Sequence, residues 1–142
     1  MKLFTIGVTK TSAEHFFERI KGAGVKRIID VRLHNVSQLA GFAKRDDLRY
    51  FASAICGIDY HHVVPLAPTQ AILNKIKNGG DWPEYESSFL ELMEARQVEN
   101  MSRTTLDGGC LLCVEDKPDY CHRRLVAEYL KRHWKNVVIS HL

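Results

Sequence analysis

The stretch Leu111–Arg124, LLCVEDKPDYCHRR, decides how this chain folds, because it leads from an apolar strand through a polar turn into a helix. The apolar run Cys110–Val114 is typical of a buried strand, and the acid Glu115 marks the point where that strand reaches the surface. Pro118 belongs to the residue types that precede or open a helix. The sequence therefore predicts a central strand, a short turn and a helix that starts at Cys121.

The first turn of this helix carries three chemically capable side chains: Cys121, His122 and Arg123. Backbone N–H groups at a helix start lack intrahelical acceptors, and the helix dipole is positive there. Such a position attracts anions and makes a nearby thiol easier to ionise. Together with Glu115, these residues predict an electropositive corner that is suited to binding or catalysis.

Apolar and polar residues alternate along the rest of the chain in a pattern of strands and helices. The predicted strands are Leu3–Gly7, Arg27–Val31, Ile58–Val63, Cys110–Val114 and Val137–Ile139. The predicted helices begin at a capping box formed by Thr11 and Glu14, at Asp46, after Thr69, after Pro83 and at Cys121. Alternation of this kind predicts parallel strands joined by right-handed crossovers. We therefore expect an α/β sandwich, with a central, mainly parallel sheet and helices on both faces.

Composition limits the classes of protein that this chain can belong to. Its 142 residues, 45% of them hydrophobic, suffice for a single α/β domain over residues 1–142. No stretch approaches the roughly 20 apolar residues that span a bilayer, and no export signal is recognised, so we expect a cytoplasmic protein without membrane contact. In that compartment the four cysteines are expected to be reduced. The net charge of +3 favours anionic partners only mildly, because the basic residues are dispersed.

Ligands of such folds bind beyond the carboxyl ends of the strands, and this rule gathers distant segments at one edge. The residues expected at that edge are Gly7–Lys10, Asp30–Ser37, His61, His62, Glu115 and Cys121–Arg123. His61 and His62 are adjacent, so at most one of them can reach the edge from its strand.

The charged candidates each have two interpretations. Asp30 and Arg32 are two residues apart and face the same side of the sheet, where they orient a phosphate or simply form an ion pair. Arg123 is unfavourable at a helix start without an anion, and that anion is a ligand or an acid such as Glu115.

The thiol and aromatic candidates are also open to two interpretations. Cys121 is either a nucleophile activated by the helix start and His122, or a small residue that packs under the turn. Phe42 either stacks on a base or anchors its loop to the core. Cys110 and Cys113 have the spacing of a redox or zinc motif, but strand alternation sends them to opposite faces, so no metal is predicted between them.

Three sequence blocks resemble a known family. Thr5–Gly7 ends the first strand, Asp30–Arg32 is followed by Ser37, and Leu112–Glu115 is followed by Cys121–Arg123. In this order they resemble the signature of the family called domain of unknown function 488. The resemblance implies a compact α/β domain with these motifs around one pocket, and it implies no reaction.

The leading hypothesis is a pocket for a phosphate-bearing ligand, an anionic small molecule such as a nucleotide, or a nucleic acid. The residues expected to bind it are Arg32, Ser37, Arg123, Gly7, Thr9, Lys10 and Phe42. A helix start close to cations is the reason for this expectation.

Whether the chain is an enzyme is left open by its sequence. In a thiol-based hydrolase or transferase, Cys121 is the nucleophile, His122 or Glu115 carries the proton, and Asp30 orients Arg32. One alternative is a non-catalytic module that binds nucleotide or nucleic acid through the same residues. The other is a metal-dependent hydrolase that uses His122, Glu115, Asp30 and Cys121, although these residues lack a recognisable ligand spacing. No metal site and no cofactor are predicted.

Overall fold

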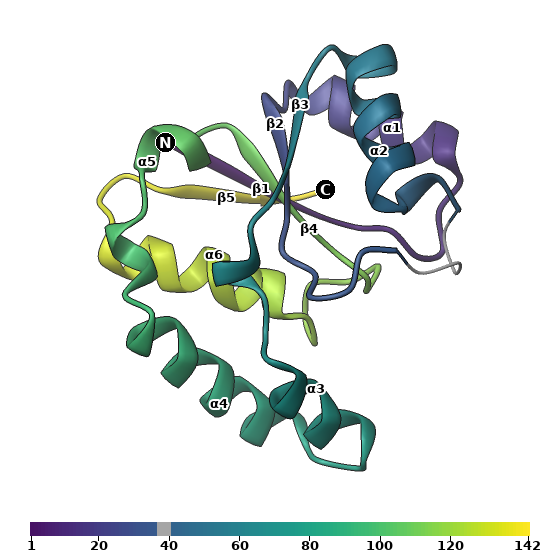
Figure 1. The fold of residues 1–142 in the computed structure, drawn as a ribbon. Coiled ribbons are helices and arrows are strands. Elements are labelled where there is room, and N and C mark those ends of the chain that lie inside the picture. The colour runs from purple at the N-terminus through teal and green to yellow at the C-terminus, as the bar shows by residue number, and fades with distance from the viewer. Residues whose placement is uncertain (37–40) are drawn as a thin grey trace.

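Five strands of the computed structural model form one parallel sheet, in the order β3-β2-β4-β1-β5 (Figure 1). The structure describes residues 1–36 and 41–142. The strands are β1 (Lys2–Gly7), β2 (Arg27–Asp30), β3 (Asp59–His62), β4 (Gly109–Cys113) and β5 (Val138–His141). All four pairings are parallel, and β4 lies at the centre of the sheet. This confirms the predicted α/β class and the central position of the strand that ends at Cys113.

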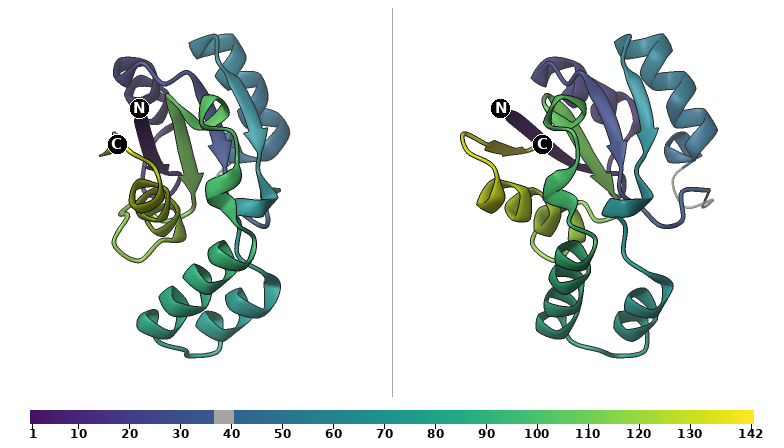
Figure 2. Two further views of the ribbon diagram at one scale, coloured as in Figure 1. Left: turned by 90° about the vertical axis from the view of Figure 1, so that its left-hand side faces the viewer. Right: turned by 60° about the vertical axis from the view of Figure 1, so that its left-hand side comes forward.

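Helices cover both faces of the sheet (Figure 1). They are α1 (Ala13–Ala23), α2 (Arg45–Phe51), α3 (Gln70–Lys77), α4 (Trp82–Ala95), α5 (Arg103–Leu106) and α6 (His122–His133). Helices α1 and α2 lie on one face, and α6 with the end of α4 lies on the other. Figure 2 shows α3 and α4 side by side, projecting beyond the sheet.

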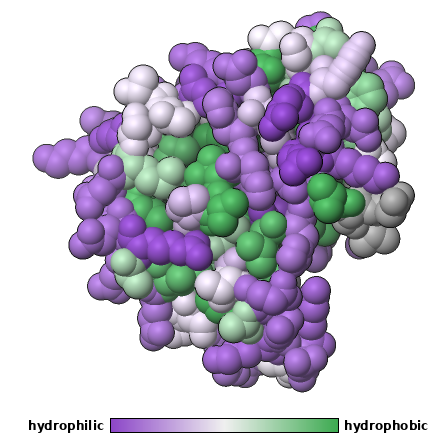
Figure 3. All heavy atoms as spheres, in the orientation of Figure 1, coloured by the Kyte–Doolittle hydropathy of each residue, from purple (hydrophilic) through white to green (hydrophobic). Residues whose placement is uncertain are grey.

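Alternation along β4 divides the core into two layers. Cys110 and Leu112 face α1 and α2, whereas Leu111 and Cys113 face α4 and α6. The predicted opposite orientation of Cys110 and Cys113 is thus confirmed. On the face shown in Figure 3, apolar side chains gather at the centre and hydrophilic ones surround them, where the α4–α6 layer reaches the surface.

Four predicted helix starts were wrong by one or two residues. Helix α4 begins at Trp82, before Pro83, and α6 begins at His122, with Cys121 as its N-cap. Ser12, not Thr11, caps α1, because its hydroxyl accepts the N–H of His15 at 3.1 Å. Thr11 instead donates to the carbonyl of Ser12. Helix α2 begins at Arg45, before the expected Asp46, and continues as a π-helix, η2 (Ala52–Cys56).

Two helical segments end at a glycine. Gly24 follows α1 with φ 72°, and Gly57 follows η2 with φ 65°. Both lie in the left-handed region, where the absence of a Cβ removes the steric cost.

Short helical turns complete the connections: η1 (Gly41–Ala43), η3 (Val64–Leu66) and η4 (Val98–Asn100). Within residues 1–36 and 41–142, none of the helices has both the length and the apolar character needed to cross a membrane.

Candidate functional site

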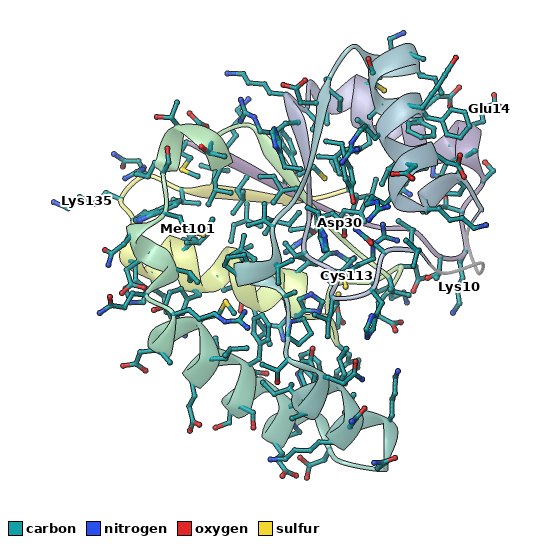
Figure 4. All side chains as sticks on the ribbon, viewed as in Figure 1. Lys10, Glu14, Asp30, Met101, Cys113 and Lys135 are labelled. Carbon is teal, nitrogen blue, oxygen red and sulfur yellow. The ribbon has the colours of Figure 1, made fainter. Side chains whose placement is uncertain are left out.

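The carboxyl ends of the strands bring four of the expected segments to one edge of the sheet. β1 ends at Gly7, β2 at Asp30, β3 at His62 and β4 at Cys113. Figure 4 shows Asp30 and Cys113 in the middle of the molecule and Lys10 at its right-hand margin. The edge holds three buried groups, each with its own partners.

The first group is an ion pair between Asp30 and Arg32 that is closed off from solvent. The carboxylate of Asp30 accepts Nε of Arg32 at 2.9 Å and Nη2 at 2.8 Å, and the two residues are 0% and 5% exposed. Nη2 also donates to the carbonyl of Ala43 at 2.7 Å. Burial alone would lower the pKa of Arg32, but the hydrogen bonds and charge of Asp30 raise it. The guanidinium is therefore held by protein groups.

Tyr60 and Asn35 extend this group. The hydroxyl of Tyr60 donates to Asp30 and accepts Nδ2 of Asn35 at 3.2 Å. Burial, followed by the bond to Asp30, raises the pKa of Tyr60 well above its ordinary value, so it remains a donor at neutral pH. On the same strand, Nε2 of His62 lies 2.7 Å from the carbonyl of Arg32, whereas His61 points to solvent.

The second group joins two thiols and an imidazole on the α4–α6 side of the sheet. Cys113, Cys121 and His122 are at most 5% exposed. Their potential ligand atoms all lie within 4.8 Å of one another, and Nδ1 of His122 is 3.5 Å from Sγ of Cys113. The end of the central strand thus meets the first residues of α6.

A main-chain carbonyl fixes which nitrogen of His122 carries the proton. Nε2 lies 2.7 Å from the carbonyl of Val31, which can only accept, so this nitrogen carries the proton. Nδ1 is left with the lone pair of the ring, and Sγ of Cys113 lies 3.5 Å from Nδ1 and 3.6 Å from Nε2. Because burial lowers the pKa of His122, the ring is neutral at physiological pH.

The thiol of Cys121 is protonated in the resting protein. Its hydrogen bond with Cys113 and its burial raise its pKa well above the ordinary value, although Arg123 opposes that shift. We expected the helix start to lower the pKa of this thiol, but its surroundings raise that pKa instead.

The third group places a buried guanidinium over the turn between β4 and α6. Arg123 is 1% exposed and donates to the carbonyl of Glu115 at 2.5 Å and to that of Asp116 at 3.2 Å. No carboxylate among the described residues pairs with it, and its Nε has no acceptor there. The carbonyl of Glu115 also touches β1, since a Cβ on Gly7 would lie 1.7 Å from it. Gly7 therefore permits this close approach.

The remaining candidates lie apart from the thiols. Thr9 donates to the carbonyl of Val114 at 2.9 Å, and Lys10 is exposed. Phe42 packs on Phe16, with ring centroids 5.1 Å apart, as expected for a loop anchored to the core. The side chain of Glu115 is exposed, and Ser37 lies outside the described residues.

Cys113 and Tyr60 are the functional candidates that sequence reasoning missed. Cys113 was considered only with Cys110, yet its face of β4 is the face on which α6 packs. The signal was available in the alternation of the strand. Nothing in the spacing of Tyr60 indicated its bond to Asp30.

Two hollows of the surface lie away from this edge. One is between α1 and the α2–η2 segment, and the other is between α3 and the start of α4. Neither is lined by the thiols or by the guanidinium groups of the edge.

Fold and site define an α/β protein with a parallel sheet and a buried thiol–imidazole cluster at its carboxyl edge. The chain belongs to the family described as Domain of unknown function DUF488, whose model matches residues 12–130. The match includes the blocks at Asp30 and at Cys121 and begins after Gly7. Comparisons with curated proteins and with solved structures found no match.

Proposed function

We propose that the carboxyl edge is the site of a thiol-based enzyme, a hydrolase or transferase, whose substrate carries a phosphate group. The observation that carries the proposal is the position of Cys121, which starts α6 beside a second thiol and a neutral imidazole. Cys121 is the nucleophile, and His122 takes its proton through Cys113.

The preference for a phosphate group is supported by positive charge that the protein leaves uncompensated. Arg123 is buried without a carboxylate partner among the described residues. The cap residue Cys121 makes no side-chain hydrogen bond to the start of α6, whereas Ser12 and Asp81 cap α1 and α4 in this way. Open amides and a buried cation together favour an anion.

The chemical step follows from the tautomer of His122. As the S–P bond forms, the thiol proton passes by way of Cys113 to Nδ1, and the bond from phosphorus to the leaving oxygen breaks. The leaving group recovers a proton from the imidazolium. Water, in a hydrolase, or an acceptor hydroxyl, in a transferase, then attacks phosphorus; the S–P bond breaks, and the proton of the attacking O–H returns by way of His122 and Cys113 to the sulfur of Cys121.

Burial sets a condition on this reaction. Cys121 is 3% exposed, so a substrate reaches it only when its surroundings open, and we propose that the preceding segment 114–120 moves. Two exposed apolar side chains, Val114 and Tyr120, lie on that segment.

Turnover of p-nitrophenyl phosphate by metal-free protein in the presence of a chelator tests the proposal. We expect Cys121→Ser to lower turnover at least about a thousandfold, and acid quenching to trap a phosphate on Cys121 of the wild type. Cys56→Ser, which removes a thiol of the α1–α2 layer, should leave turnover unchanged. Equal activity in Cys121→Ser, or salt-dependent oligonucleotide binding without any turnover, would overturn the proposal.

A further inference from the structure

We propose that Cys113, Cys121 and His122 bind one thiophilic divalent metal ion, for which zinc is the best match. This inference does not depend on the proposed function, since it concerns what the three side chains hold in the absence of substrate. It also differs from the metal site considered from the sequence, because Glu115 is exposed and Asp30 is bound to Arg32.

The donor atoms already have nearly the spacing of a zinc site. With Zn–S of about 2.3 Å and Zn–N of about 2.0–2.1 Å, tetrahedral ligands lie about 3.6 Å apart for S and N and about 3.8 Å for two sulfurs. Cys113 Sγ is 3.5 Å from Nδ1 of His122 and 3.6 Å from Nε2, and the potential ligand atoms of the three residues all lie within 4.8 Å of one another. Side-chain shifts of about 1 Å or less would complete the geometry.

The hydrogen bond of Nε2 leaves the imidazole of His122 in the tautomer that can bind a metal ion through Nδ1. Metal-bound histidines usually donate their other N–H to a carbonyl or carboxylate, which fixes the ring and its tautomer. Nε2 of His122 has such a partner in the carbonyl of Val31, at 2.7 Å. The ring of Phe89 packs against that of His122, with centroids 5.3 Å apart. Nδ1 therefore keeps the lone pair that a metal ion needs, at 3.5 Å from Sγ of Cys113.

Charge also favours the bound state. Two thiolates and one divalent ion sum to zero, so the buried cluster acquires no net charge when two protons leave. Arg123, the residue after His122, adds positive charge that stabilises the thiolate of Cys121.

Three protein ligands leave one tetrahedral position for water or an anionic group, an arrangement found in catalytic rather than structural zinc sites. Bound zinc would occupy the electron pair of Cys121 and thus inhibit its attack on a phosphate ester. Metal binding and catalysis therefore use the same thiol in alternative states.

Titration of the full chain with Co(II), followed by displacement with Zn(II), tests the metal site. We expect one equivalent of Co(II) to give a thiolate charge-transfer band and tetrahedral d–d bands, which Zn(II) abolishes. Cys113→Ser, Cys121→Ser and His122→Gln should each weaken binding at least about a hundredfold, while Cys56→Ser should bind as the wild type does.

X-ray absorption at the zinc edge of the loaded wild type removes the dependence on variants that fail to fold. Two sulfur ligands and one imidazole per zinc would support the site. No saturable binding at one equivalent, zinc with oxygen and nitrogen ligands only, or unchanged binding in both cysteine variants would overturn it. Because turnover is assayed without metal and binding without substrate, either proposal can fail while the other stands.

Discussion

Replacement of Asp30 by Asn should be one of the most damaging conservative changes in this chain. The carboxylate accepts both Nε and Nη2 of Arg32, and it also accepts the main-chain N–H of Arg32 at 3.1 Å and the hydroxyl of Tyr60. In Asp30→Asn one oxygen becomes an NH₂ group that faces the donor Nη2. The guanidinium, 5% exposed, then lacks a counter-charge.

The expected cost follows from that burial. Breaking a buried pair by removal of one partner costs about 3–5 kcal/mol, most of it from the charge left behind. The retained oxygen still accepts Nε, so we expect a loss near the lower end, about 3 kcal/mol. Urea unfolding followed by far-ultraviolet circular dichroism measures this as a lower midpoint at constant slope.

Two further variants separate the charge from the shape. Asp46→Asn breaks the exposed pair with Arg45 and should leave the free energy of unfolding almost unchanged. Asp30→Asn combined with Arg32→Met removes both charges and should recover more than half of the loss. A cost below about 1 kcal/mol for Asp30→Asn alone would refute the view that Arg32 is committed to Asp30.

Three other predictions concern packing, pH and capping. Gly7→Ala places a Cβ 1.7 Å from a carbonyl oxygen of the turn after β4 and should lower the unfolding free energy, measured in urea, by at least about 3 kcal/mol. Gly22→Ala, whose Cβ would meet open space within a helix, should raise it by up to about 1 kcal/mol. Burial raises the pKa of Tyr85, so the native state keeps a proton that the unfolded chain loses above about pH 10, and stability falls as pH rises. Tyr85→Phe should be near neutral at pH 7 and lose about 1 kcal/mol less than the wild type by pH 11; parallel pH curves would contradict this. Ser12→Ala should cost about 1 kcal/mol by loss of the α1 cap, and Thr11→Ala only a few tenths; the reverse order of melting temperatures would restore Thr11 as the cap.

The elements of the fold could be predicted because their signals are local. Glycines in the left-handed region end α1 and η2, and the apolar run before Glu115 marks the central strand. The errors at Thr11 and Asp46 arose where neighbouring polar residues compete to start a helix. Which hydroxyl accepts a hydrogen bond from the first turn of the helix depends on backbone angles that the sequence does not reveal.

The edge of the sheet could be predicted from topology, but the pairings within it could not. Strand alternation places Asp30 and Cys113 on opposite faces, so they enter different groups. Of the two interpretations given for Arg32, the structure contains the ion pair, and its partner is Asp30. Arg123 donates its hydrogen bonds to main-chain carbonyls, and such partners cannot be predicted from the order of the side chains.

The most direct test of the central claim is a crystal structure phased on sulfur anomalous signal, which locates the thiols independently of the rest of the chain. The account predicts that Sγ of Cys113 and Sγ of Cys121 lie within 4.8 Å of each other, and that the ring of His122, whose Nε2 donates to the carbonyl of Val31, lies next to them. Two sulfurs in different layers of the core, or separated by another side chain, would contradict it.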